Sequence, residues 1–441
     1  MLNRFTDVNS FINFVESQKR FSPKVSLDKM RFYLSLFDNP HLKFKSIHIT
    51  GTNGKGSVVA YLKSILRSAG FNVATFTSPY ITYFNERIGF NESYISDDDL
   101  LNIGNSILGK YDDIISSGYD LPTFFEFITL LAFIYYSKID NLDIVLVEVG
   151  MGGRLDATNV ITPLLSIITN VTLEHTKILG DTLEKIAIEK LGIVKNDSYL
   201  ISGNIDESLI KLFDKNCENK NTKHIRSALR EVEIKKMDID SSYILLDGHE
   251  FNLSLSGTHQ IENALCAFEA LETLKKIDKK WNDALSYEIY KRGFQNVSWQ
   301  GRLEKISVDP LIIIDGCHNI DGVKKVTEFI KSLDYSYKRA VISISSDKDL
   351  YEMINLIQET FDEIIITKYS YMRSSEVSVL NELLIHPNKL IIENVNDALK
   401  YCENNKVDFT IFLGSLYLVS EVRNIKGPIN KCMVQVKTPI K

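Results

Sequence analysis

The chain has 441 residues, 44% of them apolar, and a formal net charge of −6. That length predicts two domains with substantial hydrophobic cores, and the acidic balance without any Lys/Arg block argues against a nucleic-acid partner. Five scattered cysteines without a C-x-x-C pair argue against a zinc site and a disulfide framework. The densest apolar stretch, residues 124–136, is too short and too polar to span a bilayer, and the N-terminus is no signal peptide. We therefore expect a cytoplasmic monomer with small-molecule partners.

Apolar runs that fit strands alternate with segments of helical periodicity, which is typical of an α/β fold. In the first region we expect strands at residues 46–50, 72–76, 143–149 and 165–169 and helices at 57–69 and 182–194. A hairpin over 240–256, with Asp247-Gly248 as its turn, precedes helices at 258–274 and 281–292. A second strand–helix series has strands at 311–314, 340–345, 363–367, 390–392 and 409–413.

This pattern predicts an N-terminal P-loop domain with a mostly parallel sheet over residues 1–296. A smaller C-terminal Rossmann-like α/β domain is expected over residues 297–441. The polar segment 296–300 is the predicted boundary and hinge, and the tail after Arg423 is expected to be peripheral.

A glycine-rich turn joins the first expected strand to the first expected helix. It consists of Gly51, Thr52, Asn53, Gly54, Lys55, Gly56 and Ser57. Glycines let backbone N–H groups close around phosphate oxygens, the helix N-terminus adds partial positive charge, and Lys55 supplies a full one. The spacing departs from the common G-x-x-x-x-G-K-[ST] pattern, since Ile49 stands at the first glycine position and Gly56 follows the lysine. We predict a nucleoside triphosphate site, with a chance glycine-rich turn as the alternative.

Polar residues also follow two later strands, at the carboxyl edge of the expected parallel sheet. Glu148 ends the strand at 143–149, where an acid either holds Mg²⁺ against phosphates or is simply exposed. The loop after it is rich in glycine, and its Arg154 and Asp156 either contact polar substrate groups or belong to an ordinary turn. His175 follows the next strand and is either a metal or phosphate ligand or a surface histidine.

In the second domain, Asp315 and His318 stand between a strand and a helix, which repeats the same arrangement. Because both sets of residues lie at carboxyl edges of strands, we expect the two domains to direct them at a shared cleft.

Short motifs occur along the chain in a fixed order. They are Ile49-Thr-Gly-Thr-Asn-Gly-Lys-Gly-Ser57, Thr77-Ser-Pro79, Asn85-Glu-Arg-Ile88, Phe125-Glu-Phe127, Glu148-Val-Gly-Met-Gly-Gly-Arg-Leu-Asp-Ala-Thr-Asn159, His175 with Leu179-Gly-Asp-Thr-Leu183, Glu189-Lys190, Gly257-Thr-His-Gln260 with Glu262-Asn263-Ala264, Gly301-Arg-Leu-Glu304, Asp315 with His318-Asn319, and Gly414-Ser-Leu-Tyr417. Together they resemble the folylpolyglutamate synthase/dihydrofolate synthase family of the Mur ligase superfamily. The resemblance spans roughly residues 20–425. It implies an ATP- and Mg²⁺-dependent ligase that joins the amine of glutamate to a pteroate or folate carboxylate through an acyl phosphate.

The resemblance also implies roles for individual residues. Lys55 would contact the β- and γ-phosphates, Lys190 matches a lysine that the family usually carbamylates, and His318 would lie near the phosphate and the glutamate. The remaining positions are Asn263, Arg302 and Asp315 for the nucleotide, Ser78, Glu148 and His175 for the metal, and Phe124, Phe125, Glu126, Arg154, Leu155, Asp156 and Ala157 for the pterin or folate.

The sequence departs from the family pattern at several positions. Glu174 replaces an aspartate, Leu191 replaces an alanine beside Lys190, and Cys317 replaces an alanine, where we expect it to fill space without reacting. Residues 20–29, which help to bind dihydropteroate in bifunctional members, are not a clear match. Dihydrofolate synthase activity is therefore less directly supported than the ligase chemistry.

Three other interpretations stay open at this stage. The first is a Mur-type ligase acting on a UDP-linked cell-wall precursor. The second is a P-loop ATPase or switch that binds a protein partner, which leaves Asp315 and His318 unexplained. The third is a non-catalytic relative, which would be expected to have lost Lys55, Glu148 or His175.

Overall fold

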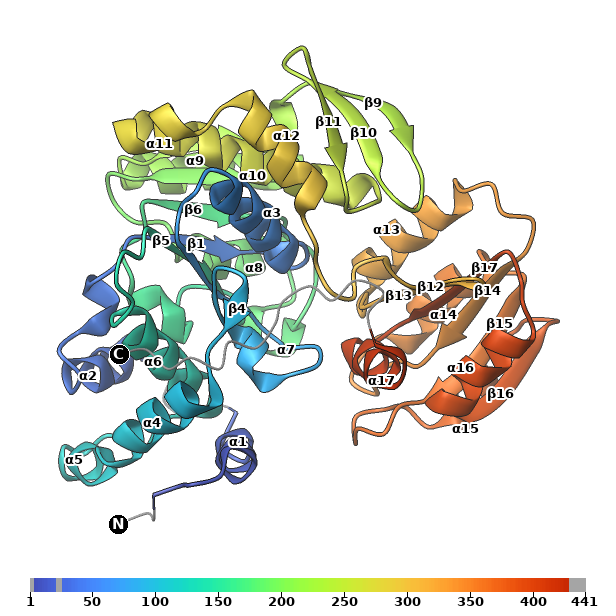
Figure 1. Cartoon of the computed structure of the whole chain (residues 1–441), viewed down its shortest axis with the longest axis horizontal. Helices are drawn as coiled ribbons and strands as arrows, with labels where there is room; N and C mark the ends of the chain where they lie inside the picture. The colour runs from blue at the N-terminus through green and yellow to red at the C-terminus, as the bar shows by residue number, and fades with distance from the viewer. Residues whose placement is uncertain (1–3, 21–25, 428–441) are drawn as a thin grey trace. The chain divides into compact units, whose positions relative to one another are not determined.

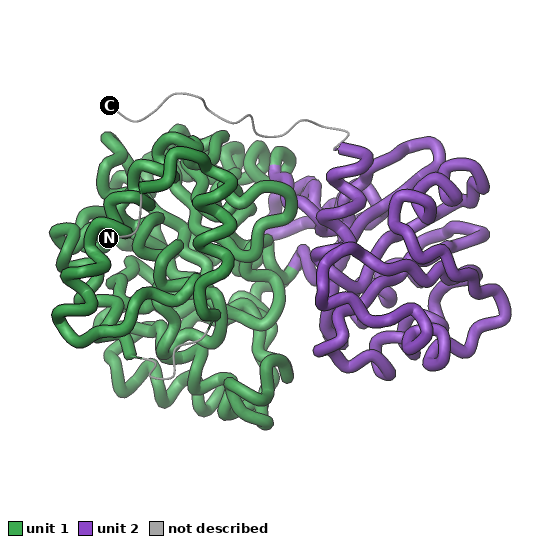
Figure 2. The backbone as a smooth tube through the Cα atoms, turned by 90° about the horizontal axis from the view of Figure 1, so that it is seen from below, with its two compact units in different colours: residues 1–232, 262–296, 433–441 green, residues 233–261, 297–432 purple. Residues whose placement is uncertain are grey.

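The computed structural model describes residues 4–20 and 26–427, so part of the segment 20–29 and most of the tail after Arg423 lie outside it. The described chain forms two compact units (Figure 2). The first comprises residues 4–20, 26–232 and 262–296, and the second comprises residues 233–261 and 297–427. The chain passes between the two units after residues 232, 261 and 296, and the function of 296–300 as a hinge stays a prediction. Residues 233–261 group with the second unit, whereas the sequence analysis assigned them to the first.

The first unit is built on an eight-stranded sheet in the order β4-β3-β2-β5-β1-β6-β7-β8. Its strands are β1 Ser46–Thr50, β2 Val73–Phe76, β3 Ile88–Phe90, β4 Ser93–Tyr94, β5 Ile144–Glu148, β6 Leu165–Ile168, β7 Tyr199–Ser202 and β8 Lys223–Arg226. Six neighbouring strands, β2, β5, β1, β6, β7 and β8, pair in parallel. Strands β3 and β4 extend the sheet beside β2 and pair antiparallel. The predicted mostly parallel sheet is confirmed. Because β1 lies between β5 and β6, the loops that follow these three strands meet at one edge.

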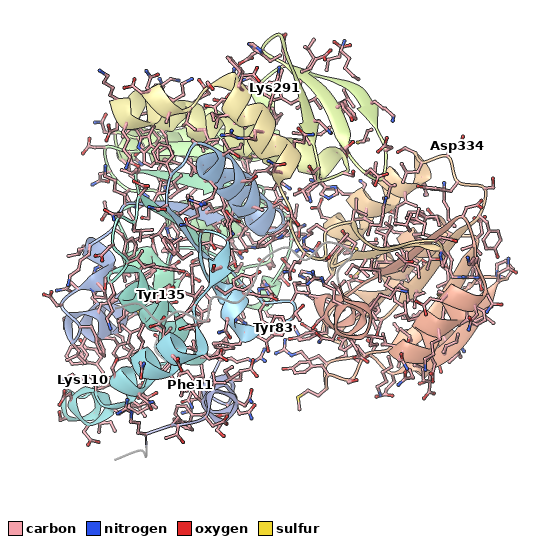
Figure 3. All side chains as sticks on the ribbon, in the orientation of Figure 1. Phe11, Tyr83, Lys110, Tyr135, Lys291 and Asp334 are labelled. Carbon is pink, nitrogen blue, oxygen red and sulfur yellow. The ribbon has the colours of Figure 1, made fainter. Side chains whose placement is uncertain are left out.

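Helices cover both faces of this sheet (Figure 1). They are α1 Val8–Glu16, α2 Leu27–Ser35, α3 Lys55–Ser68, α4 Asp97–Leu108, α5 Tyr111–Ser116, α6 Phe124–Tyr136, α7 Thr176–Leu179, α8 Leu183–Leu191, α9 Glu207–Asn219, α10 Thr258–Ile277, α11 Lys279–Ala284 and α12 Tyr287–Asn296. Alternate residues of β2 and β5, such as Phe76 and Val147, share one core with α1, α4 and α6. Phe11 of α1 and Tyr135 of α6, labelled in Figure 3, belong to that core. On α12, a Cβ at Gly293 would lie 2.5 Å from the Ile65 Cα, so glycine permits the close packing of α12 on α3.

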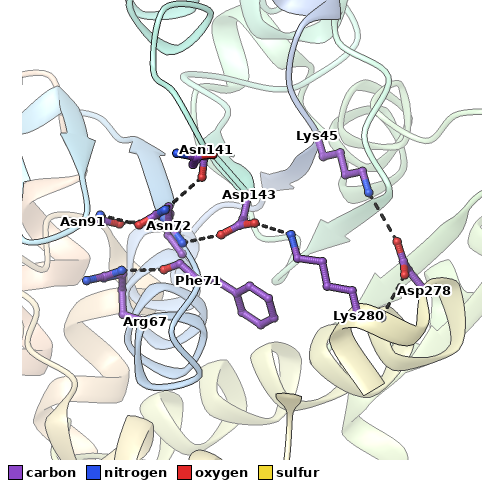
Figure 4. A network of polar contacts seen from close by, with 10 residues as sticks. Lys45, Arg67, Phe71, Asn72, Asn91, Asn141, Asp143, Asp278 and Lys280 are labelled. Carbon is purple, nitrogen blue, oxygen red and sulfur yellow. Dashed lines mark hydrogen bonds and ion pairs between the residues drawn. The ribbon is translucent and has the colours of Figure 1, made fainter. Parts of the chain in front are cut away.

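The opposite edge of the sheet, where the strands begin, is held by a polar network (Figure 4). The Asp143 carboxylate, just before β5, accepts a hydrogen bond from the Asn72 N–H at 2.7 Å and pairs with Lys280 of α11. Lys45, just before β1, lies 3.5 Å from the Asp278 carboxylate at the start of that helix. These contacts attach α11 to the amino edge and leave the carboxyl edge for other groups.

The second unit contains a six-stranded sheet in the order β12-β13-β17-β14-β15-β16. Its strands and helices are β12 Glu304–Val308, β13 Leu311–Asp315, α13 Ile320–Lys331, β14 Lys338–Ile342, α14 Leu350–Gln358, β15 Glu363–Lys368, α15 Val377–Leu383, β16 Lys389–Asn394, α16 Val395–Asn404, β17 Phe409–Leu413 and α17 Leu416–Lys426. All neighbours are parallel except β12, which pairs antiparallel with β13. A small sheet of β9 Val232–Met237, β10 Ser242–Leu246 and β11 His249–Leu253 adjoins it, and Ile239 joins the core of the second unit.

The structure corrects some of the predicted elements. The helix expected over 281–292 is two helices, because Leu285 after α11 takes an extended conformation and the chain restarts at Tyr287. The strand expected at 340–345 is β14, which ends at Ile342. The turn at Asp247-Gly248 is confirmed, with φ of 51° and 77° at its two residues. Within residues 4–20 and 26–427, no helix combines the length and the apolar character that crossing a membrane requires.

Candidate nucleotide and ligase site

The phosphate loop connects β1 to α3. Gly54 precedes the first helical residue, Lys55, with a left-handed φ of 83°. A Cβ at Gly54 would lie 2.2 Å from the Asn263 Oδ1, so the loop touches α10 at the asparagine predicted for nucleotide binding. The N–H groups of the first turn of α3 lie at the loop and give it the positive end of a helix dipole. This geometry suits a phosphate group.

Residues that follow β6 hold this loop. The Asn170 Oδ1 accepts hydrogen bonds from the N–H groups of Thr52, at 3.0 Å, and Asn53, at 2.9 Å. The Thr169 hydroxyl donates to the Asn53 carbonyl at 2.5 Å. The Lys55 ammonium donates to the carbonyl oxygens of Gly51 at 3.0 Å and Thr52 at 3.1 Å. The sequence analysis did not assign a role to Asn170 or Thr169; their place directly after a neighbouring strand was the available signal.

We predict that Gly54→Ala weakens nucleotide binding at least about tenfold, because a side chain at a left-handed position costs about 1–2 kcal/mol and the added carbon would also meet Asn263. The measurement is the Kd of a non-hydrolysable ATP analogue by titration calorimetry. Gly118→Ala is the matched control, since Gly118 has a φ of +80° but a Cβ there meets nothing within 4 Å. Unchanged analogue binding by Gly54→Ala would contradict the prediction.

Two of the three predicted metal ligands lie together. Glu148 ends β5, is 4% exposed, and its Oε2 accepts a hydrogen bond from the Ser78 N–H at 3.1 Å. His175 is exposed at the start of α7. In the part of the chain that the structure describes, no group of three His, Cys, Asp or Glu side chains is arranged to hold a metal ion. A buried carboxylate nevertheless fits Mg²⁺, which takes one or two carboxylates and fills its remaining positions with phosphate oxygens and water.

Lys190 of α8 is buried in the same region, at 3% exposed. Burial and the positive charge of Lys55 lower the pKa of Lys190 to about 7, and the Glu174 carboxylate opposes that change. The amine is therefore neutral in a large fraction of molecules near neutral pH. The acid at position 174, a departure from the family pattern, keeps its electrostatic interaction with this lysine.

The glycine-rich loop after β5 is folded around Asp156. The buried carboxylate accepts hydrogen bonds from the N–H groups of Met151, at 3.1 Å, and Thr158, at 3.0 Å. Leu155 is 38% exposed, whereas the Arg154 guanidinium is engaged by Glu189 at 2.8 Å. A Cβ at Gly150 would lie 2.5 Å from the Phe125 ring, so that ring covers the start of the loop.

Two other predicted folate residues have structural partners. The Glu126 carboxylate caps α6 by accepting from the Thr123 N–H and hydroxyl, each at 2.8 Å, and pairs with Lys29 at 2.9 Å. The Phe124 ring lies 5.2 Å from the Arg87 guanidinium. Glu126 therefore shapes the start of this helix. The Arg87 guanidinium also lies 5.8 Å from the Phe84 ring, and the neighbouring Tyr83, labelled in Figure 3, is 57% exposed.

In the second unit, three predicted residues gather in the loop after β13. The Asp315 carboxylate is 1% exposed and accepts from the N–H groups of Leu303 at 2.9 Å and Cys317 at 2.8 Å. The His318 Nδ1 lies 2.9 Å from the Gly316 carbonyl, which makes Nδ1 the protonated nitrogen. A Cβ at Gly316 would lie 2.8 Å from an Arg302 nitrogen. Burial and Asp315 raise the pKa of the Cys317 thiol well above its usual value, which agrees with its expected role as a filler.

The phosphate loop lies at the carboxyl edge of a parallel sheet, beside a buried acid and a buried lysine, which is typical of an ATP-dependent ligase. Residues 49–271 match the Mur ligase middle domain. A dihydrofolate synthase/folylpolyglutamate synthase of Bacillus subtilis is 32% identical over 96% of this chain and 99% of its own length. A folylpolyglutamate synthase of Lacticaseibacillus casei is 32% identical over 88% of this chain and 92% of its own length. The crystal structure of a folylpolyglutamate synthase from Thermotoga maritima superposes with a TM-score of 0.82 at 31% identity, covering 96% of this chain and 98% of that one. The chain belongs to the folylpolyglutamate synthase/dihydrofolate synthase family.

Proposed function

We propose that this protein is an ATP-dependent ligase that adds L-glutamate to the carboxylate of a folate, of dihydropteroate, or of both, and that it acts as a monomer. The observation that carries the proposal is the grouping of Lys55, Glu148 and Lys190 at the carboxyl edge of β1 and β5, next to the glycine-rich loop. One edge would thus supply a phosphate site, a metal ligand and a loop whose exposed apolar residue, Leu155, could contact a ring system.

The chemistry follows from the charges at this edge. A carboxylate is a poor acyl donor, and bound ATP with a divalent metal ion supplies the phosphoryl group that converts it into an acyl phosphate. Lys55 and the N–H groups of the phosphate loop would stabilise the charge that develops on the transferred group. The glutamate nitrogen then forms a bond to the acyl carbon, phosphate departs, and the amine loses a proton. We propose Ser78, Glu148 and His175 as the metal-binding side chains and Asn263, Arg302, Asp315 and His318 as nucleotide and phosphate contacts.

We further propose that Lys190 is carbamylated. Its neutral amine can attack CO₂, forming an N–C bond and releasing one proton, which leaves a carboxylate in place of an ammonium. Such a group would lower the local positive charge beside Lys55 and add an oxygen ligand for a divalent ion. The depressed pKa of the buried amine supports this step, because only the neutral form reacts.

The proposed function is tested by ADP release from the purified protein with Mg²⁺, ATP and L-glutamate. One reaction contains dihydropteroate and another contains tetrahydrofolate, and omission of glutamate is the control. We expect glutamate-dependent release with at least one acceptor, and release with both makes the protein bifunctional. If neither acceptor gives ADP release but a UDP-linked cell-wall precursor does, the proposal is overturned in favour of a ligase that acts on that precursor.

A further inference from the structure

A buried chain of three polar side chains connects β1 to the glycine-rich loop. The His48 Nε2, in the middle of β1, lies 2.8 Å from the Thr158 Oγ1, and the Thr158 hydroxyl donates to the Asp156 Oδ1 at 2.5 Å. His48 and Thr158 are fully buried and Asp156 is 8% exposed. None of the groups assigned above to nucleotide, metal or folate requires this contact between His48 and Thr158.

Burial raises the pKa of Asp156, whereas the N–H and O–H groups that donate to it favour its ionised form. With Asp156 ionised, its carboxylate only accepts hydrogen bonds, so the Thr158 hydroxyl donates to Asp156 and the His48 Nε2–H donates to Thr158. Burial and Lys195 lower the pKa of His48 to about 3, so the imidazole is neutral. The His48 Nδ1 has no hydrogen-bond partner among the residues that the structure describes, so the bond to Thr158 is what orients the ring.

Side chains of β1 thereby help to determine the shape of the glycine-rich loop after β5. His48 precedes the phosphate loop by only three residues, and Asp156 organises the glycine-rich loop by accepting from the Met151 N–H. A second link runs from the Thr50 hydroxyl to the Gly152 carbonyl at 2.6 Å. Both loops are attached to the same strand, so their separation is set by these side chains.

We propose that His48 and Thr158 are positioning residues that hold the glycine-rich loop at a defined distance from the phosphate loop, which aligns the acceptor carboxylate with the phosphoryl group. The inference rests on the proposed function and deepens it, since it concerns the placement of the same acceptor. A misplacement of reacting groups by about 1 Å can cost about 100-fold in rate, so a contact of this kind affects catalysis without touching substrate.

The same unit offers a matched control. The His224 Nε2 lies 2.8 Å from the Ser202 hydroxyl and its Nδ1 lies 2.6 Å from the Asp214 carboxylate. In this second polar chain the histidine stands between the hydroxyl and the carboxylate, and the Asp214 carboxylate is half-exposed. The chain joins β7, β8 and α9 at the far end of the sheet and contacts neither loop. If breaking such a polar chain lowered activity only by weakening the fold, a loss would appear at both sites.

The test compares Thr158→Val, which keeps the shape and removes the hydroxyl, with Thr158→Ser, which retains it, and with His224→Asn. We expect Thr158→Val to lower kcat/KM for the folate acceptor by about 10- to 100-fold, with unchanged Kd for an ATP analogue. Thr158→Ser and His224→Asn are expected to keep kcat/KM near the wild-type value. If Thr158→Val does not fold, two His48 variants replace the Thr158 variants. His48→Gln takes the place of Thr158→Ser, because the Gln amide reaches the Nε2 position and can keep the contact, and His48→Asn takes the place of Thr158→Val, because its shorter amide cannot.

A second readout does not depend on the substrate. Hydrogen exchange at the Met151 amide is expected to be faster in Thr158→Val than in the wild type and unchanged in His224→Asn. Wild-type exchange and kcat/KM in Thr158→Val, or an equal kinetic loss in His224→Asn, would overturn the inference. Absence of ligase activity in the wild type would instead refute the proposed function, and the exchange comparison would still decide the positioning role.

Discussion

Lys55→Ala is expected to lower kcat at least about 1,000-fold, because it removes the full positive charge at the phosphate loop where negative charge develops during phosphoryl transfer. The Lys55 ammonium now donates to the Gly51 and Thr52 carbonyl oxygens, so the side chain is already held over the loop. The measurement is steady-state ADP release with saturating ATP, glutamate and acceptor. Unfolding midpoints of variant and wild type show whether the fold is retained.

The control for Lys55→Ala is Lys63→Ala, a lysine of the same helix two turns further from the loop. It changes the net charge of α3 equally but leaves the phosphate loop untouched, and we expect near-normal turnover. Turnover within about tenfold of the wild type in Lys55→Ala would contradict the assignment of the phosphate loop.

The second large effect is expected at Lys190. Lys190→Gln keeps a polar side chain of similar length but cannot form a carbamate, and we expect kcat to fall at least about 100-fold. In the wild type, activity should decline in CO₂-free buffer and recover when bicarbonate is added. Intact-mass measurement under CO₂ should show an adduct of one CO₂ that Lys190→Gln lacks.

The pH dependence of the adduct follows from the pKa of Lys190, about 7. Below that value the amine is mostly protonated and unreactive, and above it the amine is neutral. At constant CO₂ pressure, the carbamylated fraction should therefore increase as the pH is raised through 7. Because carbamylation releases a proton, mass action acts in the same direction.

Lys195→Gln is the control for Lys190→Gln. Lys195 is half-buried, burial lowers its pKa to about 8, and its ammonium donates to the Asn159 Oδ1 at 2.8 Å. We expect it to affect stability without making activity depend on CO₂. An inactive Lys190→Gln together with CO₂-independent wild-type activity would mean that Lys190 acts as an amine, and the carbamate would be refuted.

Much of the architecture was predictable because it depends on local patterns. The β-branched runs at β1, β5 and β13 and the helical periodicity after them are properties of neighbouring residues. The short antiparallel strands β3 and β4 were missed, since they have two or three residues each and depend on the neighbouring β2 for their pairing. The break between α11 and α12 was missed because Leu285 carries no glycine or proline signal.

The candidate site divides in the same way. The glycines, Lys55, Glu148 and Lys190 could be identified from motifs, because phosphate loops and strand ends are local features. Glu126 was assigned to folate from its motif, but the structure shows its carboxylate capping α6 and paired with Lys29. The capping role of Glu126 could be predicted, because Thr123 and Glu126 form a capping box within four consecutive residues. The ion pair with Lys29 could not be predicted, because it joins residues far apart in the sequence.

The sequence by itself determined the chemistry available at each strand end: a glycine-rich loop with one lysine in it, an acid at the end of a strand and Lys190 in a segment of helical periodicity. Only the tertiary structure decided which of these groups meet. Asn170 supports Thr52 across 118 positions of the chain, and His48 reaches Thr158 across 110. The physical reason is that strand order in a parallel sheet places β1 between β5 and β6, and this order is set by packing of whole elements rather than by any short stretch of residues.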